Sequence, residues 1–455
     1  MDRNLQKEMI LKDNLWKVMW TLSWPAVIAM VLHGLNTVFD AIFVGRFIGE
    51  TALAGVSIAY PLAQFSVGIG SMIGVGAGSL LSIVIGSNDI ATQKKLIANT
   101  NYLLIISGIL TTVIGLLLMN PLLRLMGASG EELIFGANYF RVTLYGSVFW
   151  IAGLGYNMVV RAEGKMKSAA FMMGTGLVVN IIANYLLIVV FQFGVEGAAW
   201  GTNLGMLVYT IAFFVYCRKK KATFETNELK ISRDKNITKQ ILSLGFPSLI
   251  MTTMSVVQGM IVMYALNSYG TASDVAFYGV VYRIFIFLLT PIFGLMRALQ
   301  PAMGINFGAK QYDRAISSFK VFAAAAFIII FPFWLIMMLA PDMVLSIMLP
   351  AKEFLSSDFM NFRIFVGLLP VLPIMFMAMT MWPAINNSKP AGIIGIARQL
   401  ILYVPAMLIL PKYFGVGWVY KGAFFIDLII IIIVSLLVKR EFSKLRQGDV
   451  IQLKN

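Results

Sequence analysis

Residues 16–45 of this chain read WKVMWTLSWPAVIAMVLHGLNTVFDAIFVG, with one lysine near the start and one aspartate near the end. A helix needs about 20 mostly apolar residues to cross the hydrocarbon core of a bilayer. Eleven more stretches of similar length and apolarity follow along the chain. The pattern predicts an all-α integral membrane protein with twelve transmembrane helices. The expected spans are 16–45, 52–86, 100–123, 136–159, 168–191, 195–217, 238–267, 273–305, 318–341, 357–386, 390–411 and 415–438.

The composition of the 455 residues agrees with a membrane protein, because 59% are hydrophobic and 13% are charged, against roughly 45–50% and 25% in soluble proteins. Too few polar residues remain to cover soluble helices, which argues against a soluble enzyme or a nucleic-acid-binding module. The single cysteine, Cys217, excludes a disulfide framework. The single histidine, His33, leaves few ways to build a catalytic triad or a zinc site. We therefore expect no enzyme activity, no nucleic-acid partner and no bound cofactor.

The net charge of +15 indicates how the chain lies in the membrane. If successive loops alternate sides, 26 of the 36 lysines and arginines fall on the side of the N-terminus, six fall on the other side and four fall inside spans. Basic residues collect in cytoplasmic loops. The distribution predicts a multi-pass protein of the cell membrane with both termini in the cytoplasm.

The longest polar stretch, residues 218–239, divides the expected spans six and six. The two halves align at a nearly constant offset of 221 to 222 residues. Pro25, early in the first span, corresponds to Pro247, and Gly86, at the end of the second span, corresponds to Gly308. These landmarks indicate that the chain is two copies of one six-helix unit.

The repeat predicts an N-lobe at residues 1–217, a cytoplasmic linker at 218–239 and a C-lobe at 240–455. Six spans are an even number, so both bundles have the same orientation and are related by a pseudo-twofold axis along the membrane normal. Secondary transporters with such repeats bind substrates and ions near the midplane and rock one bundle against the other. The sequence therefore indicates a transporter that works by alternating access.

One face of the first span carries the strongest functional candidate, Asp40. An acidic side chain in mid-bilayer costs about 2.5–3.5 kcal/mol on insertion scales, which makes it a functional candidate by default. His33, Asn36 and Thr37 precede it at a spacing that places all four residues on one helix face. We interpret Asp40 as a carboxylate that exchanges a proton or binds Na⁺, with a structural hydrogen bond as the alternative. His33 fits a functional and a structural role equally well.

The fifth and sixth spans add small polar residues. Asn180 and Asn184 are four residues apart on one face, and Thr202 and Asn203 lie early in the next span. Amide and hydroxyl oxygens suit a hard cation or a hydrogen-bond network around a carboxylate. Small polar residues also hold membrane helices together, so both readings stay open.

The second half differs in its polar residues. Gln258 stands where the repeat would put Asn36, and an apolar residue, Val262, stands where it would put Asp40. Ion coupling is therefore expected mainly in the first half. Asp427, in the last span, is an exception, and we expect Arg398 to be its ion-pair partner, more as a structural pair than as a binding site.

Other residues of the second half support a substrate pocket weakly. Methionine is adaptable and recurs on promiscuous binding surfaces, which makes Met260 a candidate for the substrate cleft. The methionines of the tenth span are spaced by two residues, so they point around the helix. We expect three arginines to lie near span ends with their charged groups at the membrane surface: Arg283, Arg297 and Arg363.

Taken in order, several short motifs resemble the multidrug and toxic compound extrusion (MATE) transporters over nearly the whole chain. They are Asp40-Ala-Ile-Phe-Val-Gly45-Arg46, Gly74-Val-Gly76-Ala-Gly78, Arg161-Ala-Glu-Gly164-Lys165, Gly197-Ala-Ala-Trp-Gly201-Thr202, Gly304-Ile-Asn-Phe-Gly308 and Arg398-Gln399. The resemblance implies export of organic cations and drugs in exchange for H⁺ or Na⁺. The DinF-like branch of the family fits best.

That branch implies a first-lobe ion site made by an acid in helix 1, an Asn-x-x-x-Asp pair in helix 5 and a threonine in helix 6. Asp40, Asn180 and Thr202 stand at matching positions, but the second member of the pair is Asn184. One carboxylate in place of two leaves the coupling ion open between H⁺ and Na⁺. The NorM-like branch uses an acid in helix 7, where this chain has Gln258.

We therefore predict a monomeric antiporter in the lipid bilayer that exports organic cations or drugs, with Asp40 as the coupling carboxylate. Na⁺ at Asp40, Asn180, Asn184 and Thr202 is the only metal ion considered. The substrate cleft is expected to include His33, Asn36, Thr37, Gln258, Met260, Arg398 and Asp427. The main alternative is a flippase or exporter of a lipid or lipid-linked compound. A major facilitator fold and a membrane-embedded enzyme fit less well, and no phosphate-binding loop for ATP is present.

Overall fold

The computed structural model describes residues 5–224, 230–346 and 354–449, and every regular element in these ranges is a helix. The elements are α1 (Leu5–Lys12), α2 (Leu15–Phe47), α3 (Glu50–Gly86), α4 (Ile90–Leu125), α5 (Gly130–Tyr145), α6 (Ser147–Ala162), α7 (Met166–Asn184), the π-helix η1 (Tyr185–Val190), α8 (Gly194–Arg218), α9 (Lys235–Tyr269), α10 (Ala272–Gly308), α11 (Tyr312–Leu339), α12 (Pro341–Ser346), α13 (Ser356–Val366), α14 (Leu372–Ala384), α15 (Lys389–Ile396), the π-helix η2 (Ala397–Tyr403), α16 (Val404–Phe414) and α17 (Trp418–Gln447).

Ten of the expected spans are confirmed as continuous helical segments, long and apolar enough to cross a membrane, within the described residues. The remaining two, 136–159 and 357–386, differ from the expectation because each is broken into two shorter helices. The first consists of α5 and α6, and the second consists of α13 and α14.

The break between α5 and α6 has a local cause at Gly146. A methyl group at this position would lie 2.2 Å from the side chain of Asn203 in α8. In the space that the glycine leaves, Nδ2 of Asn203 donates to the carbonyl oxygen of Val142 at 2.7 Å, and its Oδ1 accepts from Nε1 of Trp150 at 2.9 Å. Asn203 thus supplies the hydrogen bond that Val142 loses where the helix ends.

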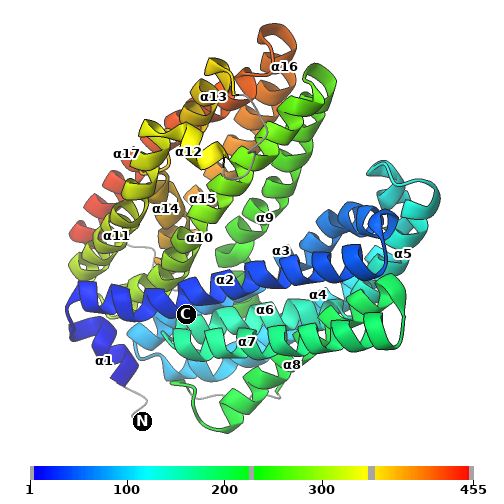
Figure 1. Ribbon diagram of the computed structural model, residues 1–455. Helices are drawn as coiled ribbons and strands as arrows, with labels where there is room; N and C mark the ends of the chain where they lie inside the picture. The colour runs from blue at the N-terminus through cyan, green and yellow to red at the C-terminus, as the bar shows by residue number, and fades with distance from the viewer. Residues whose placement is uncertain (1–4, 225–229, 347–353, 450–455) are drawn as a thin grey trace.

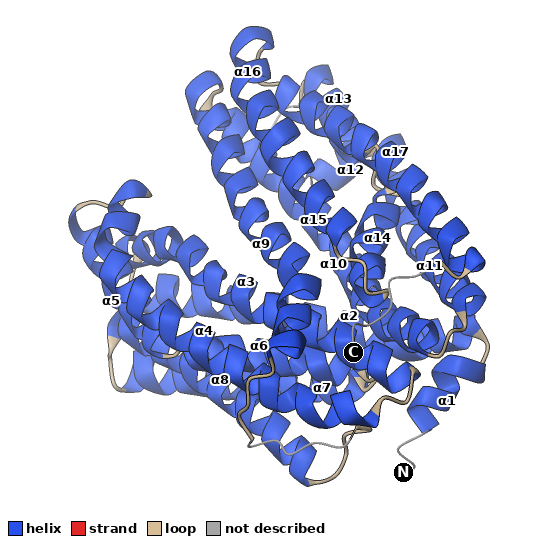
Figure 2. Cartoon of the chain, turned by 180° about the vertical axis from the view of Figure 1, so that it is seen from behind, coloured by secondary structure: helices blue, strands red, loops and turns tan. Residues whose placement is uncertain are grey.

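The helices form two groups, α2 to α8 and α9 to α17, which meet at one end and diverge toward the other (Figures 1 and 2). At the meeting end, a methyl group at Gly86 would lie 2.2 Å from the carbonyl oxygen of Ile305, and one at Gly308 would lie 2.0 Å from that of Ile83. These two contacts are equivalent under the 222-residue offset, as the repeat predicts. They do not fix the lobe boundaries at 217 and 240, which stay predictions.

A second close crossing joins α3 of the first group to α9 of the second. A methyl group at Gly76 would lie 1.9 Å from the carbonyl oxygen of Ile241, and one at Gly245 would lie 1.7 Å from that of Met72. Glycine on both helices lets the two backbones touch, as small residues do in membrane helix pairs. The groups are therefore packed backbone to backbone at the end that also carries the linker, here called the linker side.

Helix α1 bridges the two groups on the linker side. Nζ of Lys7 donates to the carbonyl oxygen of Ile85 at 2.7 Å, at the end of α3, and Nε2 of Gln6 donates to that of Gly164 at 2.9 Å. From the second group, the guanidinium of Arg314 in α11 donates to the carbonyl oxygen of Ile10 at 3.0 and 2.9 Å. These contacts add to the closure of the linker side.

The start of the linker is anchored by Glu163, which follows α6. Its carboxylate accepts hydrogen bonds from the hydroxyl of Tyr216 at 2.5 Å and from both the backbone N–H and the hydroxyl of Thr223 at 2.6 Å. Burial raises the pKa of the Glu163 carboxyl, and these hydrogen bonds oppose that rise. The Arg161-Ala-Glu-Gly164 motif therefore has a structural part, which holds the linker against the first group.

We expect the Glu163→Ala variant to be less stable by about 1–3 kcal/mol, because the buried donors of Tyr216 and Thr223 lose their acceptor. Thermal unfolding of the purified protein in detergent measures the change. Glu196→Ala removes an exposed acid in the first turn of α8 and is the matched control. Equal unfolding temperatures for the two variants would contradict the assigned role of Glu163.

Candidate functional site

Three helices, α2, α7 and α8, bring the polar residues of the first group together. Gly197, Gly201 and Gly205 repeat every four residues along α8. A methyl group at Gly201 would lie 2.0 Å from Oδ1 of Asn184, and one at Gly205 would lie 2.8 Å from the carbonyl oxygen of Gly176. This row of glycines lets α8 approach α7 closely enough for their polar side chains to meet.

Asp40 of α2 accepts three hydrogen bonds at this junction. Nδ2 of Asn184 donates to Oδ1 at 2.6 Å, while Oγ1 of Thr202 and Nδ2 of Asn36 each donate to Oδ2 at 3.3 Å. Asn180 joins through Thr202, because its Nδ2 donates to Oγ1 at 3.2 Å. These five residues are called the acid cluster below.

The structure thus brings together the four residues that the resemblance assigned to an ion site, and Asn36 with them. Their role in ion coupling stays a prediction. Three hydrogen bonds of the cluster end on one carboxylate, and in the described part of the chain that carboxylate forms no ion pair with a basic side chain. A proton on Asp40 would neutralise the cluster, whereas Na⁺ would require amide oxygens to replace the amide N–H groups as its nearest neighbours.

Two tyrosines near Asp40 were not identified from the sequence. Tyr60 of α3 and Tyr139 of α5 both interact electrostatically with the carboxylate. Thr37, expected in the same polar stripe, contacts the hydroxyl of Tyr60 and makes no hydrogen bond to Asp40. Aromatic residues are common in membrane spans, so the sequence pattern carries no signal that would single these two out.

A small cavity of about 30 Å³ adjoins the acid cluster and is large enough for a water molecule. Its lining includes His33, Asn36, Asn180, Thr202 and Tyr209. His33 therefore lies on the polar face of α2, as the spacing predicted, but it lines the cavity next to the acid cluster and makes no hydrogen bond to Asp40.

No group of three or more histidine, cysteine, aspartate or glutamate side chains with metal-binding geometry occurs among the described residues. The oxygen atoms of Asp40, Asn180, Asn184 and Thr202 are the donors that a Na⁺ ion would use. Asn184 Oδ1 is buried and has no hydrogen-bond partner. One oxygen of the predicted ion site is thus available to a cation or a water molecule.

The candidates of the second group form a separate polar cluster. Nε of Arg398 donates to Oδ1 of Asp427 at 2.8 Å, and both side chains are mostly buried. The expected ion pair is therefore present. Nε2 of Gln399 donates to Oε1 of Gln258 at 2.7 Å. Met260 is exposed on α9, and substrate contact by any of these residues stays a prediction.

Between the two groups lies a cavity of about 230 Å³, called the central cavity. Its walls come from α2, α3, α9, α10 and α14, and its polar lining residues include Ser79, Thr252, Arg297, Gln300 and Thr380. The lining contains none of the seven residues that the sequence suggested for a substrate cleft. Met379, from the methionine-rich tenth span, does line it.

Two arginines lie elsewhere than expected. Arg297 was placed near a span end with its charge at the membrane surface, but it lies within α10, lines the central cavity and has a buried Nε. Arg161 was counted among the cytoplasmic loop residues, but it lies in the last turn of α6 and is 2% exposed. The charge count used only the positions of these arginines along the chain. In the fold, packing of α6 and α10 against α3 buries Arg161 and the Nε of Arg297. Arg283 and Arg363 are exposed, and their position at the membrane surface stays a prediction.

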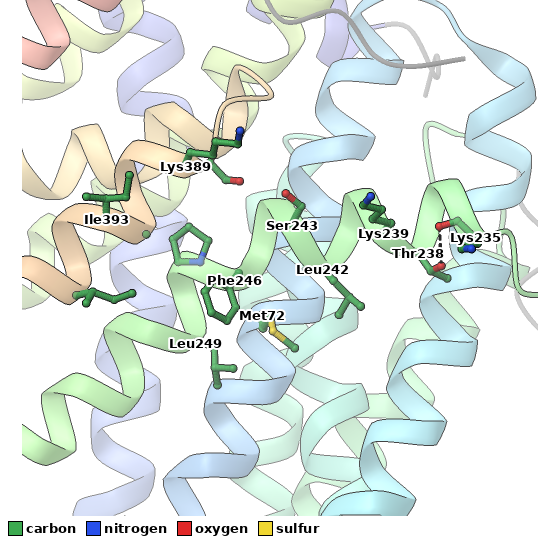
Figure 3. Close-up of a pocket in the computed structure, with 14 residues that line it drawn as sticks. Met72, Lys235, Thr238, Lys239, Leu242, Ser243, Phe246, Leu249, Lys389 and Ile393 are labelled. Carbon is green, nitrogen blue, oxygen red and sulfur yellow. Dashed lines mark hydrogen bonds between the residues drawn. The ribbon is translucent and has the colours of Figure 1, made fainter.

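A larger groove than the central cavity lies between α9 and α15, and Met72 of α3 also lines it (Figure 3). Its volume is about 980 Å³ and its walls are mostly apolar. Lys235, Lys239 and Lys389 are the charged residues of its lining. Apolar walls with lysines toward the linker side are typical of a surface that meets lipid tails and head groups.

The MatE family matches residues 25–186 and again residues 247–408, at the same 222-residue offset as the repeat. Multidrug export protein MepA of Staphylococcus haemolyticus (strain JCSC1435) is 23% identical over 404 residues, which are 89% of either chain. Multidrug export protein MepA of Staphylococcus aureus (strain MSSA476) is 26% identical over 300 residues, 66% of either chain.

Solved structures with the same fold include a MATE protein in the bent conformation, with a TM-score of 0.90 and 24% identity, over 97% of this chain and 98% of that one. An outward-facing multidrug resistance MATE family transporter of the MOP superfamily has a TM-score of 0.87 and 24% identity, over 96% and 98%. This likeness confirms the expected fold class, an all-α membrane protein of two six-helix lobes.

Proposed function

This chain belongs to the MatE family of transporters, and from that premise we propose that it is an antiporter that exports amphipathic organic compounds in exchange for H⁺ or Na⁺. It is a transporter and not an enzyme. The observation that carries the proposal is the acid cluster, in which one membrane-embedded carboxylate collects hydrogen bonds from α2, α7 and α8. The names of the MepA relatives support multidrug export.

Asp40 is the coupling group of this proposal. Its ionised form is held by three donors on two neighbouring helices and on α2 itself, so a change of charge on Asp40 alters the attraction between α2 and the α7–α8 pair. A cation can shift a conformational equilibrium only through different affinities for the two states. Binding of H⁺ or Na⁺ at Asp40 would loosen or reorganise the hydrogen bonds that hold α2 in place.

Proton exchange is the simpler reading of the cluster. The side chains nearest the carboxylate oxygens direct N–H and O–H groups at them. This arrangement stabilises a bare carboxylate, whereas a cation would require these side chains to turn their oxygens toward it. Asn184, in place of a second acid, removes one of the charges that would attract Na⁺. We propose H⁺ as the first candidate and Na⁺ as the second, with no resident cofactor.

The substrate path of this proposal runs between the lobes. The lobes are packed together on the linker side and diverge on the other (Figure 1). If the basic linker side is cytoplasmic, as the positive-inside rule predicts, this conformation is open to the outside. We place the protein in the cell membrane, with residues 1–217 and 240–455 as the rocking units, and expect it to act as a monomer.

Efflux of a fluorescent organic cation from vesicles that contain the purified protein tests the proposal. A pH gradient and a Na⁺ gradient are imposed separately. We expect accelerated efflux with the pH gradient and little effect of Na⁺ alone. Efflux that depends only on the Na⁺ gradient would show that Na⁺, and not H⁺, is the coupling ion. No gradient-driven movement of soluble cations, combined with transfer of lipid head groups across the bilayer, would favour a flippase instead.

A further inference from the structure

Two arginines, one buried and one partly buried, lie inside the protein without a counter-charge. The side chain of Arg161 is 2% exposed, and its Nε and Nη1 have no hydrogen-bond partner. Arg297 lines the central cavity, and its Nε is likewise buried without a partner. Within residues 5–224, 230–346 and 354–449, neither guanidinium forms an ion pair with a carboxylate.

The two arginines stand on helices that meet at α3. Their guanidiniums repel each other as like charges. Gln300, one turn after Arg297, donates through Nε2 to the hydroxyl of Ser79 at 3.0 Å. A methyl group at Gly78 would lie 3.0 Å from Cβ of Ala162 and 3.2 Å from Nε2 of Gln300. The end of α6 and the C-terminal part of α10 therefore meet at one point of α3.

Two further side chains near Arg161 and Arg297, His33 and Tyr209, can donate hydrogen bonds and carry no negative charge. His33 interacts electrostatically with both arginines, and Tyr209 interacts with Arg161. The hydroxyl of Tyr209 is also buried without a hydrogen-bond partner. Burial of a charge costs free energy unless the charge is paired. Burial of two like charges near each other costs more, because they also repel. The arrangement has the composition of an anion site: two guanidiniums, a phenol hydroxyl and an imidazole.

We propose that Arg161 and Arg297 form a binding site for a compact oxyanion, a carboxylate or a phosphate. Arg297 opens on the central cavity, and Arg161 lies outside the cavity lining, at the adjoining end of α6. The planar fork of a guanidinium matches both groups with paired hydrogen bonds. The cavity of about 230 Å³ is smaller than the roughly 300–1,000 Å³ pockets that enclose whole drug-sized ligands. The site therefore takes the anionic end of a larger compound, whose remainder extends between the lobes.

The consequence is a wider substrate range than organic cations. A zwitterionic or anionic compound would place its carboxylate or phosphate at the arginine pair. The source of the oxyanion is a transported compound or a free inorganic anion, and the chemistry of the site is the same for both. The transport part of this inference rests on the proposed export function, whereas the binding part does not.

The binding part is tested with inorganic phosphate and the purified full-length protein in lipid nanodiscs. A ligand that binds only the folded state raises the unfolding temperature. We expect millimolar phosphate to stabilise the unaltered protein and the Arg297→Lys variant, and to have no such effect on Arg297→Gln. Arg283→Gln, which removes an exposed arginine from the same helix, is the matched control and should respond like the unaltered protein.

The transport part compares a carboxylated rhodamine zwitterion with its ethyl ester, a cation of nearly the same shape, in vesicles. In Arg297→Gln we expect efflux of the zwitterion to fall about tenfold more than efflux of the ester, as the loss of one charge-assisted hydrogen bond implies. Export of neither dye by the unaltered protein would count against the proposed function, and the phosphate experiment would still decide the site.

The outcomes separate the two sources. A selective loss of zwitterion efflux supports the site and assigns it to a transported compound. Phosphate stabilisation that Arg297→Gln abolishes, with equal effects on both dyes, supports the site and assigns it to a free anion. Equal effects on both dyes together with no phosphate stabilisation would overturn the inference.

Discussion

Replacing Asp40 with asparagine is expected to reduce ion-driven efflux to the passive leak of vesicles without the protein. The side chains have nearly the same shape, so the polar contacts with Asn184 and Thr202 can reorganise without opening a cavity. The amide cannot take up or release a proton, and it has no charge to attract Na⁺. A gradient of either ion would then have no site in the acid cluster on which to act.

The measurement is the initial rate of dye efflux under an imposed pH gradient, with equal amounts of folded protein verified by size-exclusion chromatography. A matched control removes the other buried acid of the described spans together with its partner, as Arg398→Gln with Asp427→Asn. The pair is removed as a unit because deleting one member leaves a buried charge unpaired. We expect this control to remain accelerated by the pH gradient, whatever its absolute rate of efflux. Gradient-driven efflux by Asp40→Asn at the unaltered rate would reject Asp40 as the coupling group.

Much of the acid cluster could be predicted from the sequence, for physical reasons that differ between its members. An acid inside an apolar span is conspicuous, and the helical repeat places Asn36 on the face of Asp40 without any knowledge of the fold. The approach of Asn180, Asn184 and Thr202 to that face required the family resemblance. The glycines of α8 make this approach possible, but their spacing in the sequence does not indicate which helix packs against them.

The arginine pair shows what the sequence pattern could not predict. Arg161 stands at the end of an apolar stretch, where most arginines reach the membrane surface. Its burial follows from the contact of α6 with α3 and from the nearby end of α10, which are distant in the sequence. Arg297 did lie inside an expected span, and that position was the available signal. No feature of the sequence, such as an acidic residue that could pair with both arginines, predicts that Arg297 lies near Arg161.

The second large effect is expected at the crossing of α3 and α9, where Gly245→Ala should force the lobes apart on the linker side. A methyl group at Gly245 would lie 1.7 Å from the carbonyl oxygen of Met72, and a backbone carbonyl cannot move without its helix. Overpacking of this kind typically costs about 1–3 kcal/mol, which corresponds to a shift of roughly 5- to 150-fold in a two-state equilibrium. The conformation closed on the linker side should lose that much population.

Spin labels on the linker side of each lobe report this shift as a distance distribution. Ala91→Cys in α4 and Ser317→Cys in α11 are exposed positions for the labels, in a Cys217→Ser background. We expect Gly245→Ala to lengthen the distance between them and to lower efflux about tenfold, because the transport cycle must pass through the closed conformation.

Gly259→Ala tests whether the effect comes from the crossing and not from the loss of a helical glycine. It lies in the same helix as Gly245, but a methyl group there has no neighbouring atom within 4 Å. Alanine is the better helix former, so this variant should transport at least as well as the unaltered protein and keep the short distance. If Gly245→Ala behaves like Gly259→Ala in both measurements, backbone contact between α3 and α9 does not control closure. The hydrogen bonds of α1 with the two lobes would then be the contacts that hold the linker side together.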